Sequence, residues 1–390
     1  MTIDVARVRS DTPGCENQAH FNNAGAALSP QPILDTVIAH LNREAEIGGY
    51  EAAAEASDRL EHLYAAAAQL VGGKPQEIAY IENATRAWDM AFYAIDWQEG
   101  DQILTAQAEY AANYIAYLHM VKRRGVEIIA VPNDQHGQIS VSALEERITD
   151  RTKLIAITHI PTNGGLVNPA AEVGKVAKAH GIHYLLDACQ SVGQIPMDVK
   201  AIGCDMLSAT GRKYLRGPRG TGFLWVREPL IETLDPPLLD LHAATLTGPY
   251  SYEVRNDARR FENWESFVAG RLGLAAAIDY ALDLGMDAIR DRIYALAQRL
   301  RTGLDTLSGV TVRDLGAEKC GIVSFTVDGH APADIKETLA AQRFNVSASR
   351  RSSTLLDMAD RQIDALVRAS VHYYNTEEEV DRLIAAVDSL

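Results

Sequence analysis

The segment around Lys213 combines residue types that could do chemistry. Lys213 stands between an apolar run and a glycine-rich turn, directly after Arg212. Partial burial and a neighbouring cation lower the pKa of a lysine, which turns its amine into a nucleophile. The glycines and Thr210 of the same segment would let backbone amides and a hydroxyl approach a phosphate. Taken alone, the segment is also consistent with a basic, glycine-rich surface turn.

A second candidate, Asp187, follows an apolar run that starts at His183. The run has the pattern of a strand buried on both faces, and ligands in open α/β sheets bind at the carboxyl ends of the strands. A carboxylate at such a place is costly unless a cation or several donors meet it. For an aspartate considered in isolation, a helix N-cap or a loop position is the more frequent explanation.

A third segment, residues 81–86, ends a predicted strand and begins a predicted helix. Thr85 is a candidate N-cap for this helix, and the exposed amides of a helix start form a ready site for an anion. A plain cap without a ligand is the commoner case. This segment therefore has an ordinary structural interpretation as well.

The elements that must position these residues form a regular alternation of short β-branched runs and longer amphipathic runs. Strands that are almost continuously apolar, with helices between them, predict an α/β fold with a mostly parallel seven-stranded sheet sandwiched by helices. The seven predicted strands are Glu77–Ile81, Gln102–Thr105, Glu127–Val131, Leu154–Thr158, His183–Leu186, Met206–Ser208 and Gly222–Val226.

The rhythm changes after about residue 236. A helical pattern runs over Glu265–Ser308 with a break near Gly285, and Thr376 and Glu379 have the spacing of a capping box that starts a last helix. Two or three strands and one helix are predicted between these helices, at Val310–Val312, Gly321–Val327, Ala333–Ala341 (the helix) and Phe344–Ser347.

The length and composition limit the organisation and the partners. A chain of 390 residues exceeds the usual size of a single core, and we expect a large domain over residues 31–245 and a smaller α+β domain from residues 1–30 plus 246–390. The net charge of −15 makes nucleic acid and anionic lipid poor partners. We expect no signal peptide and no membrane-spanning run, and the four scattered cysteines lack a CxxC pair. We expect a cytoplasmic protein without disulfides or a metal site.

The order of the three chemical segments along the chain resembles fold-type I pyridoxal 5′-phosphate (PLP) enzymes. Within these, the chain is similar to the class V aminotransferase group, which includes cysteine desulfurases, isopenicillin N epimerase-like proteins and carbon–sulfur lyases. The resemblance begins at Phe21 and ends in the segment 367–379. It implies a PLP cofactor, an amino-acid substrate, a homodimer and a small α+β domain beside the large one.

The resemblance also implies roles for single residues. Lys213 matches the lysine that carries the cofactor as a Schiff base, Asp187 the carboxylate that pairs with the pyridine nitrogen, and Tyr110 the aromatic that stacks on the ring. Gln190 matches the partner of the ring hydroxyl. The predicted phosphate cradle consists of Ala84, Thr85, Arg86, Thr210 and Arg212, and the predicted substrate site consists of Arg368, which clamps the carboxylate, with Asn163, Asn23, Ala24 and Arg216.

Two departures from the group matter for the reaction. Desulfurases carry a nucleophilic cysteine shortly before the Arg368 motif, whereas this chain has no cysteine after Cys320. A persulfide mechanism therefore lacks its nucleophile, and Cys189 is interpreted as a core residue that points away from the ring. The second departure is Trp264-Glu265, where relatives often have a Gly-Thr that reaches the phosphate of a neighbouring subunit.

We expect β-elimination from a cysteine S-conjugate or cysteine sulfoxide, which releases pyruvate, ammonia and a sulfur product. The motifs around Asp187 and Lys213 look most like those of hercynylcysteine sulfoxide lyases and isopenicillin N epimerase-like proteins. An aminotransferase or an amino-acid epimerase of the same group is the alternative. A catalytically inactive binding or regulatory relative is the alternative of a different class.

Overall fold

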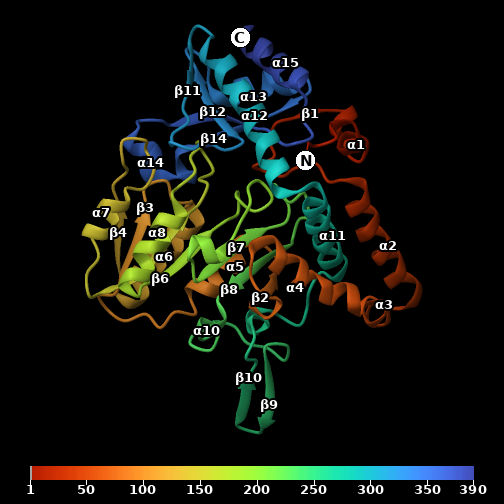
Figure 1. Ribbon diagram of the computed structural model, residues 1–390, viewed down its shortest axis with the longest axis vertical. Helices are drawn as coiled ribbons and strands as arrows, with labels where there is room; N and C mark the ends of the chain where they lie inside the picture. Colours follow the sequence, from red (N-terminus) through yellow and green to blue (C-terminus); the bar gives the residue numbers. More distant parts are fainter. Residues whose placement is uncertain (1) are drawn as a thin grey trace.

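A seven-stranded sheet forms the centre of the computed structural model, which describes residues 2–390 (Figure 1). The strand order is β2-β8-β7-β6-β5-β3-β4, and only β8 runs antiparallel to its neighbours. The prediction of a mostly parallel seven-stranded sheet is confirmed. The strands are β2 (Ile78–Ile81), β3 (Gln102–Ala106), β4 (Glu127–Val131), β5 (Thr152–Thr158), β6 (His183–Asp187), β7 (Met206–Thr210) and β8 (Gly222–Val226).

Helices cover both faces of this sheet, which explains why its strands are apolar on both sides. In β6, Leu186 packs into one hydrophobic cluster and Leu185 into the other, because successive side chains point to opposite faces. The helices of this part are α2 (Gln31–Ile47), α3 (Gly49–Glu55), α4 (Ser57–Val71), α5 (Ala84–Phe92), α6 (Ala111–Arg124), α7 (Val141–Glu146), α8 (Ala170–His180), α9 (Val199–Ile202) and α10 (Glu228–Ile231).

Polar residues extend two central strands, β6 and β7, beyond their predicted ends. Asp187 belongs to β6, where it pairs in register with Thr158 of β5 and Ser208 of β7. Thr210 likewise ends β7. Backbone ladder bonds continue past the apolar run, so the pattern of hydrophobic residues placed these ends too early. The polar side chains are thereby held at one edge of the sheet by its regular backbone.

The C-terminal part contains an antiparallel sheet of order β11-β12-β15-β14. The predicted helix break is confirmed at Gly285, which has a φ of 86° and separates α11 from α12. Strands β9 (Ala244–Gly248) and β10 (Ser251–Val254) form a hairpin that projects from the body (Figure 1). The other elements are α11 (Val268–Leu284), α12 (Met286–Asp305), β11 (Val310–Val312), β12 (Ile322–Val327), α13 (Pro332–Ala341), α14 (Leu355–Asp360), β15 (Ala365–Ser370) and α15 (Glu377–Asp388).

The predicted single strand Phe344–Ser347 is wrong, because the structure divides this segment. Its first half, β13 (Phe344–Asn345), pairs with β1 (Ala19–His20), and its second half begins β14 (Ser347–Arg350). A short apolar run does not reveal that its strand changes partner. The pairing attaches the N-terminal segment, which includes α1 (Val5–Ser10), to the C-terminal part, whereas the domain boundaries stay a prediction.

The start of the last helix agrees with the sequence. Thr376 Oγ1 accepts from the Glu379 amide at 3.2 Å, and Glu379 Oε2 accepts from the Thr376 amide at 3.2 Å. The predicted capping box is confirmed. None of the helices in residues 2–390 has both the length and the apolar character needed to span a membrane.

Candidate active site

Two adjoining cavities lie where the predicted chemical segments meet. The first, of about 300 Å³, is lined by residues from all three segments, and the second, of about 360 Å³, shares Tyr110, Arg212 and Lys213 with it. The first cavity includes Ala84, Thr85, Asp187 and Thr210, and the second includes Ala24, Asn163 and Arg368. Segments that are more than a hundred residues apart in the sequence therefore line one continuous site.

Lys213 lies between the two cavities and is 9% exposed. It follows β7 in the turn that leads to β8, where the Gly211 amide donates to the Thr221 carbonyl. The interpretation of Cys189 as a core residue is wrong, because its thiol lines the cavity and contacts Lys213. The chain folds back after β6, since the Cys189 amide donates to Asp187 Oδ1 at 2.9 Å. Burial raises the pKa of this thiol, so it stays protonated.

The Asp187 carboxylate is 5% exposed at the end of β6. Its Oδ2 accepts from Asn113 Nδ2 at 3.0 Å, and its Oδ1 from the Cys189 amide. Burial raises the pKa of Asp187, and the Asn113 hydrogen bond and the Lys213 charge act in the opposite direction. The sequence reasoning missed Asn113 and its partner Glu109, although their i, i+4 spacing on a helix start was visible.

The helix start that lines the cavity is capped by Asn83, and the prediction of Thr85 as N-cap is wrong. Asn83 has extended backbone geometry, and its Oδ1 accepts from the Arg86 amide at 3.0 Å. Thr85 is already the second residue of α5 and faces the cavity. The helix N-terminus thus presents its positive end to the site, which favours an anionic group.

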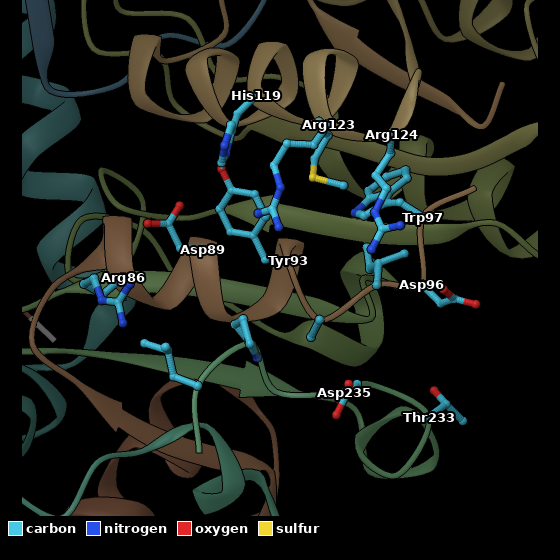
Figure 2. Close-up of a pocket in the computed structure, with 15 residues that line it drawn as sticks. Arg86, Asp89, Tyr93, Asp96, Trp97, His119, Arg123, Arg124, Thr233 and Asp235 are labelled. Atoms are coloured by element: carbon cyan, nitrogen blue, oxygen red, sulfur yellow. The ribbon is translucent and has the colours of Figure 1, made fainter. Parts of the chain in front are cut away.

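The side chain of Arg86 does not line either cavity of the site. It lines a separate cavity of about 650 Å³, together with Asp89 of the same helix, Tyr93 directly after it, and His119 and Arg123 from α6 (Figure 2). Arg86 is one position too far along α5 to face the site, because each helical residue turns by about 100°. Its predicted place in the phosphate cradle is therefore wrong for the side chain.

Arg368 extends from β15 into the second cavity and is 7% exposed. Its Nη1 donates to the carbonyl and to Oγ1 of Thr162, at 3.1 and 2.6 Å, and its Nη2 donates to Asn22 Oδ1 at 3.2 Å. Burial lowers the pKa of Arg368 to about 10, which leaves it charged at neutral pH. Its Nε is buried and has no hydrogen-bond partner within residues 2–390.

The predicted substrate residues Asn23 and Arg216 lie outside the cavities. Asn23 Nδ2 donates to the carbonyls of His20 and Ser370, and its neighbour Asn22 is the one that meets Arg368. Arg216 is 1% exposed. Its guanidinium donates to three groups of the N- and C-terminal segments, Thr12 Oγ1, the Leu28 carbonyl and the Tyr373 hydroxyl. Both predictions were wrong because these polar groups hold the structure together.

Two buried amides have one open atom each. Gln190 Nε2 donates to the Ala24 carbonyl at 3.1 Å, and Asn163 Nδ2 donates to Thr354 Oγ1 at 3.0 Å. Their carbonyl oxygens find no partner in the part of the chain that the structure describes. A buried polar atom without a partner is unusual in a folded protein and indicates a group that a ligand completes.

These groups fit a phosphorylated pyridine aldehyde. The Lys213 amine suits the aldehyde, the N-terminus of α5 suits the phosphate, and the Asp187 carboxylate suits a protonated ring nitrogen. Tyr110, which is 37% exposed, lines both cavities and offers a flat face to the ring.

A family comparison decides the assignment, because the profile described as Aminotransferase class-V matches residues 19–383. The chain belongs to the class-V aminotransferase family. It is a PLP-dependent enzyme, in agreement with the cofactor that the site fits. It is 31% identical to a probable cysteine desulfurase of Halobacterium salinarum over 99% of this chain and 96% of that protein, and 27% identical to one of Pyrococcus abyssi over 98% and 96%.

Solved structures of this family have the same fold. The apo cysteine desulfurase of Thermococcus onnurineus superposes with a TM-score of 0.92 at 27% identity, covering 100% of this chain and 98% of that one. The cystine C–S lyase C-DES, solved with its reaction product cysteine persulfide, superposes with a TM-score of 0.87 at 25% identity, covering 97% and 99%.

Proposed function

We propose that this class-V enzyme is a carbon–sulfur lyase that acts by β-elimination on a cysteine S-conjugate or a cysteine sulfoxide. The products are pyruvate, ammonia and the released sulfur compound. The observation that carries the proposal is the segment 347–353, formed by β14 and the turn after it, which lines the second cavity with serines and Arg350 and contains no cysteine. Sulfur that has no acceptor thiol on this segment leaves with the product. The similarity to a cystine C–S lyase also supports a carbon–sulfur lyase.

The one thiol that lines the site does not replace the missing nucleophile. Cys189 lies beside Lys213 at the cofactor cavity rather than on the segment 347–353. Because burial raises its pKa, it is the neutral thiol and not the reactive thiolate.

In this proposal each residue of the site has a definite task. The bound cofactor supplies an electron sink for the negative charge that develops at Cα. Asp187 would hold a proton on the ring nitrogen, and the first turn of α5 with Thr210 and Arg212 would hold the phosphate. Tyr110 would pack on the ring. The unpartnered carbonyl oxygen of Asn163, which lines the second cavity, and that of Gln190, which lines neither cavity, would accept from donors of the ligand.

The substrate is oriented at the second cavity. Arg368 pairs with the α-carboxylate, and its own contacts to Thr162 and Asn22 fix the plane of the guanidinium. Lys213 would hold the cofactor through its amine, and the same amine, when free, would take the Cα proton. The electron pair of the Cα–H bond then forms the Cα=Cβ double bond, while the carbon–sulfur bond breaks and its electron pair leaves with sulfur. Water hydrolyses the released enamine to pyruvate and ammonia.

Arg350 is the residue that favours a polar substituent on the sulfur. It lies exposed on β14 at the second cavity, whereas its neighbour Arg351 is paired with Asp364 at 2.6 Å. A free guanidinium near the position of the substrate side chain attracts an acidic group or the oxygen of a sulfoxide. The resemblance to hercynylcysteine sulfoxide lyases supports this class of substrate.

We also propose that the enzyme is a homodimer. The hairpin β9–β10 projects from the body (Figure 1) and carries Leu246, 83% exposed, and Tyr250, fully exposed. Apolar side chains in water are unfavourable, and a second copy would cover them. Light scattering should give twice the mass of the chain, and a monomer at micromolar concentration would contradict the proposal.

The reaction is tested with the purified enzyme and a panel of cysteine S-conjugates and sulfoxides. We expect a visible absorbance band from the lysine-bound cofactor, absent in Lys213→Ala, and pyruvate from at least one sulfur substrate. Conversion of the cofactor to its amine form without pyruvate would instead indicate an aminotransferase. Inversion at Cα alone would indicate an epimerase, and the absence of any band after adding PLP would contradict the assigned site.

A further inference from the structure

Glu109 is a buried carboxyl group directly behind the site. It is 3% exposed and precedes Tyr110 at the start of α6. Its Oε1 accepts from the Tyr110 amide at 2.7 Å, from Asn113 Nδ2 at 3.0 Å and from the Thr158 hydroxyl, and its Oε2 is 3.0 Å from the Thr105 hydroxyl. A buried carboxyl with partners on β3, β5 and α6 has a fixed position.

Asn113 joins this carboxyl to the cofactor site. Its Nδ2 is 3.0 Å from Glu109 Oε1 and 3.0 Å from Asp187 Oδ2. A side-chain amide nitrogen carries two hydrogens, so each carboxyl group receives one of them. Apart from the Cys189 amide, Asn113 is the donor that holds Asp187 among residues 2–390. The orientation of Asp187 therefore depends on an amide that Glu109 orients in turn.

We propose that Glu109 is a positioning residue for Asp187. Glu109 acts through Asn113, and it does so as the neutral acid. This inference rests on the proposed function, because there Asp187 faces the ring nitrogen of the cofactor. Every hydrogen-bond partner of Glu109 is a neutral group, and the nearest charged carboxylate lies only one amide away. Two buried anions at that separation repel each other, so one of them keeps its proton.

The hydrogen bonds show how a neutral Glu109 fits. Its Oε1 remains the acceptor for Tyr110 and Asn113, while a proton on Oε2 is donated to the hydroxyl of Thr105 or Tyr117. A hydroxyl can donate or accept, so no partner is lost. Asp187 is then the single anion and keeps its charge for the ring nitrogen. A glutamine would reproduce this arrangement, with its amide nitrogen in place of the protonated oxygen.

The electrostatics agree with this geometry. Burial raises the pKa of Glu109 to about 7, with the charge of Asp187 adding to the shift. The titratable groups that face it are Asp187 from β6 and Tyr117 from α6, and Lys213 lies beyond Asp187. Because the unfolded chain releases this proton near pH 4.5, Glu109 stabilises the fold less as the pH rises from about 4.5 to about 7.

The test measures cofactor affinity of the apo protein by fluorescence titration for a series of variants. Asn113→Leu removes the bridging amide and should weaken PLP binding about tenfold or more. Glu109→Gln mimics the neutral acid and should stay within about twofold of the wild type at pH 6. Thr105→Val is the matched control, since it removes one partner of Glu109 without touching Asn113, and its affinity should also stay unchanged. If Asn113→Leu does not fold, Asn113→Ala takes its place.

A second readout follows the thermal midpoint of apo wild type and Glu109→Gln between pH 4.5 and 7. The wild type should lose stability relative to Glu109→Gln as the pH rises across this range. The same change of thermal midpoint with pH in both proteins would overturn the neutral form of Glu109. Unchanged PLP affinity in Asn113→Leu would overturn the positioning role, and a loss in Glu109→Gln as large as in Asn113→Leu would overturn the neutral form. A wild type that binds no PLP would instead contradict the proposed function.

Discussion

The cofactor cavity and the substrate cavity adjoin at Lys213 but are built in different ways. The cofactor cavity uses strand ends and a helix start, and its carboxyl groups are buried and hydrogen-bonded. The substrate cavity is lined by the segment 347–353, which begins as the edge strand β14 and in which Arg350 is exposed. Groups held at the ends of central strands change little when substrates change, whereas an exposed polar edge segment can differ between relatives. The comparison assigns the shared chemistry to the first cavity and the choice of substrate to the second.

The largest effect is expected where the two cavities meet. Lys213→Ala removes both the amine that holds the cofactor and the base that takes the Cα proton, so kcat/KM should fall by about 10⁴-fold or more. Steady-state pyruvate release measures it. Added methylamine should restore part of the rate, because a small amine can enter the cavity. A residual rate within about tenfold of the wild type would contradict the role of Lys213.

Arg368→Lys should reduce kcat/KM by about 100-fold, mostly through KM, because a point charge cannot replace the planar guanidinium fork. Kinetics with one sulfur substrate measure the change. Arg382→Lys, on the exposed face above Phe344, serves as the control and should leave KM unchanged. A drop in kcat with constant KM would show that Arg368 does not bind the substrate carboxylate.

Arg350→Ala should separate substrates instead of lowering all rates. We expect about a tenfold increase in KM for substrates with an acidic or sulfoxide side group and no change for S-methylcysteine. Arg351→Ala is the matched control, because Arg351 is already paired with Asp364. An equal effect of Arg350→Ala on both kinds of substrate would show that Arg350 does not determine substrate specificity.

The smallest effect is expected at the start of α5, where Asn83 is the helix cap and Thr85 is the proposed contact to the cofactor. Asn83→Ala removes the N-cap of α5 and should lower the free energy of unfolding by about 1 kcal/mol. Thr85→Ala should leave this free energy within about 0.5 kcal/mol of the wild type and weaken PLP binding. Denaturation and PLP titration of both variants check the pair. A loss of stability in Thr85→Ala and not in Asn83→Ala would show that Thr85 is the N-cap.

The sequence pattern predicted the sheet well because each of its strands is an apolar run between helices. It predicted Lys213, Asp187 and Arg368 through motif resemblance, and all three line the cavities. It did not separate Asn22 from Asn23, since neighbouring residues point in different directions only once the backbone is known.

The other errors also arise from long-range contacts. Arg216 resembles a ligand in the motif, yet Thr12 and Tyr373 use its guanidinium. The strand β15 was not predicted as a strand, although it carries Arg368. Glu109 was passed over because a carboxyl before a helix looks like an ordinary surface residue until Thr158 and Asn113 are seen to enclose it.

The most direct test of the central claim is the ratio of pyruvate to alanine that the enzyme forms from a cysteine-derived substrate. β-Elimination gives pyruvate and ammonia, whereas transfer of sulfur to an enzyme thiol leaves alanine. We predict pyruvate in step with the released sulfur compound and no alanine. Alanine as the main product, together with a persulfide on the protein, would contradict the account.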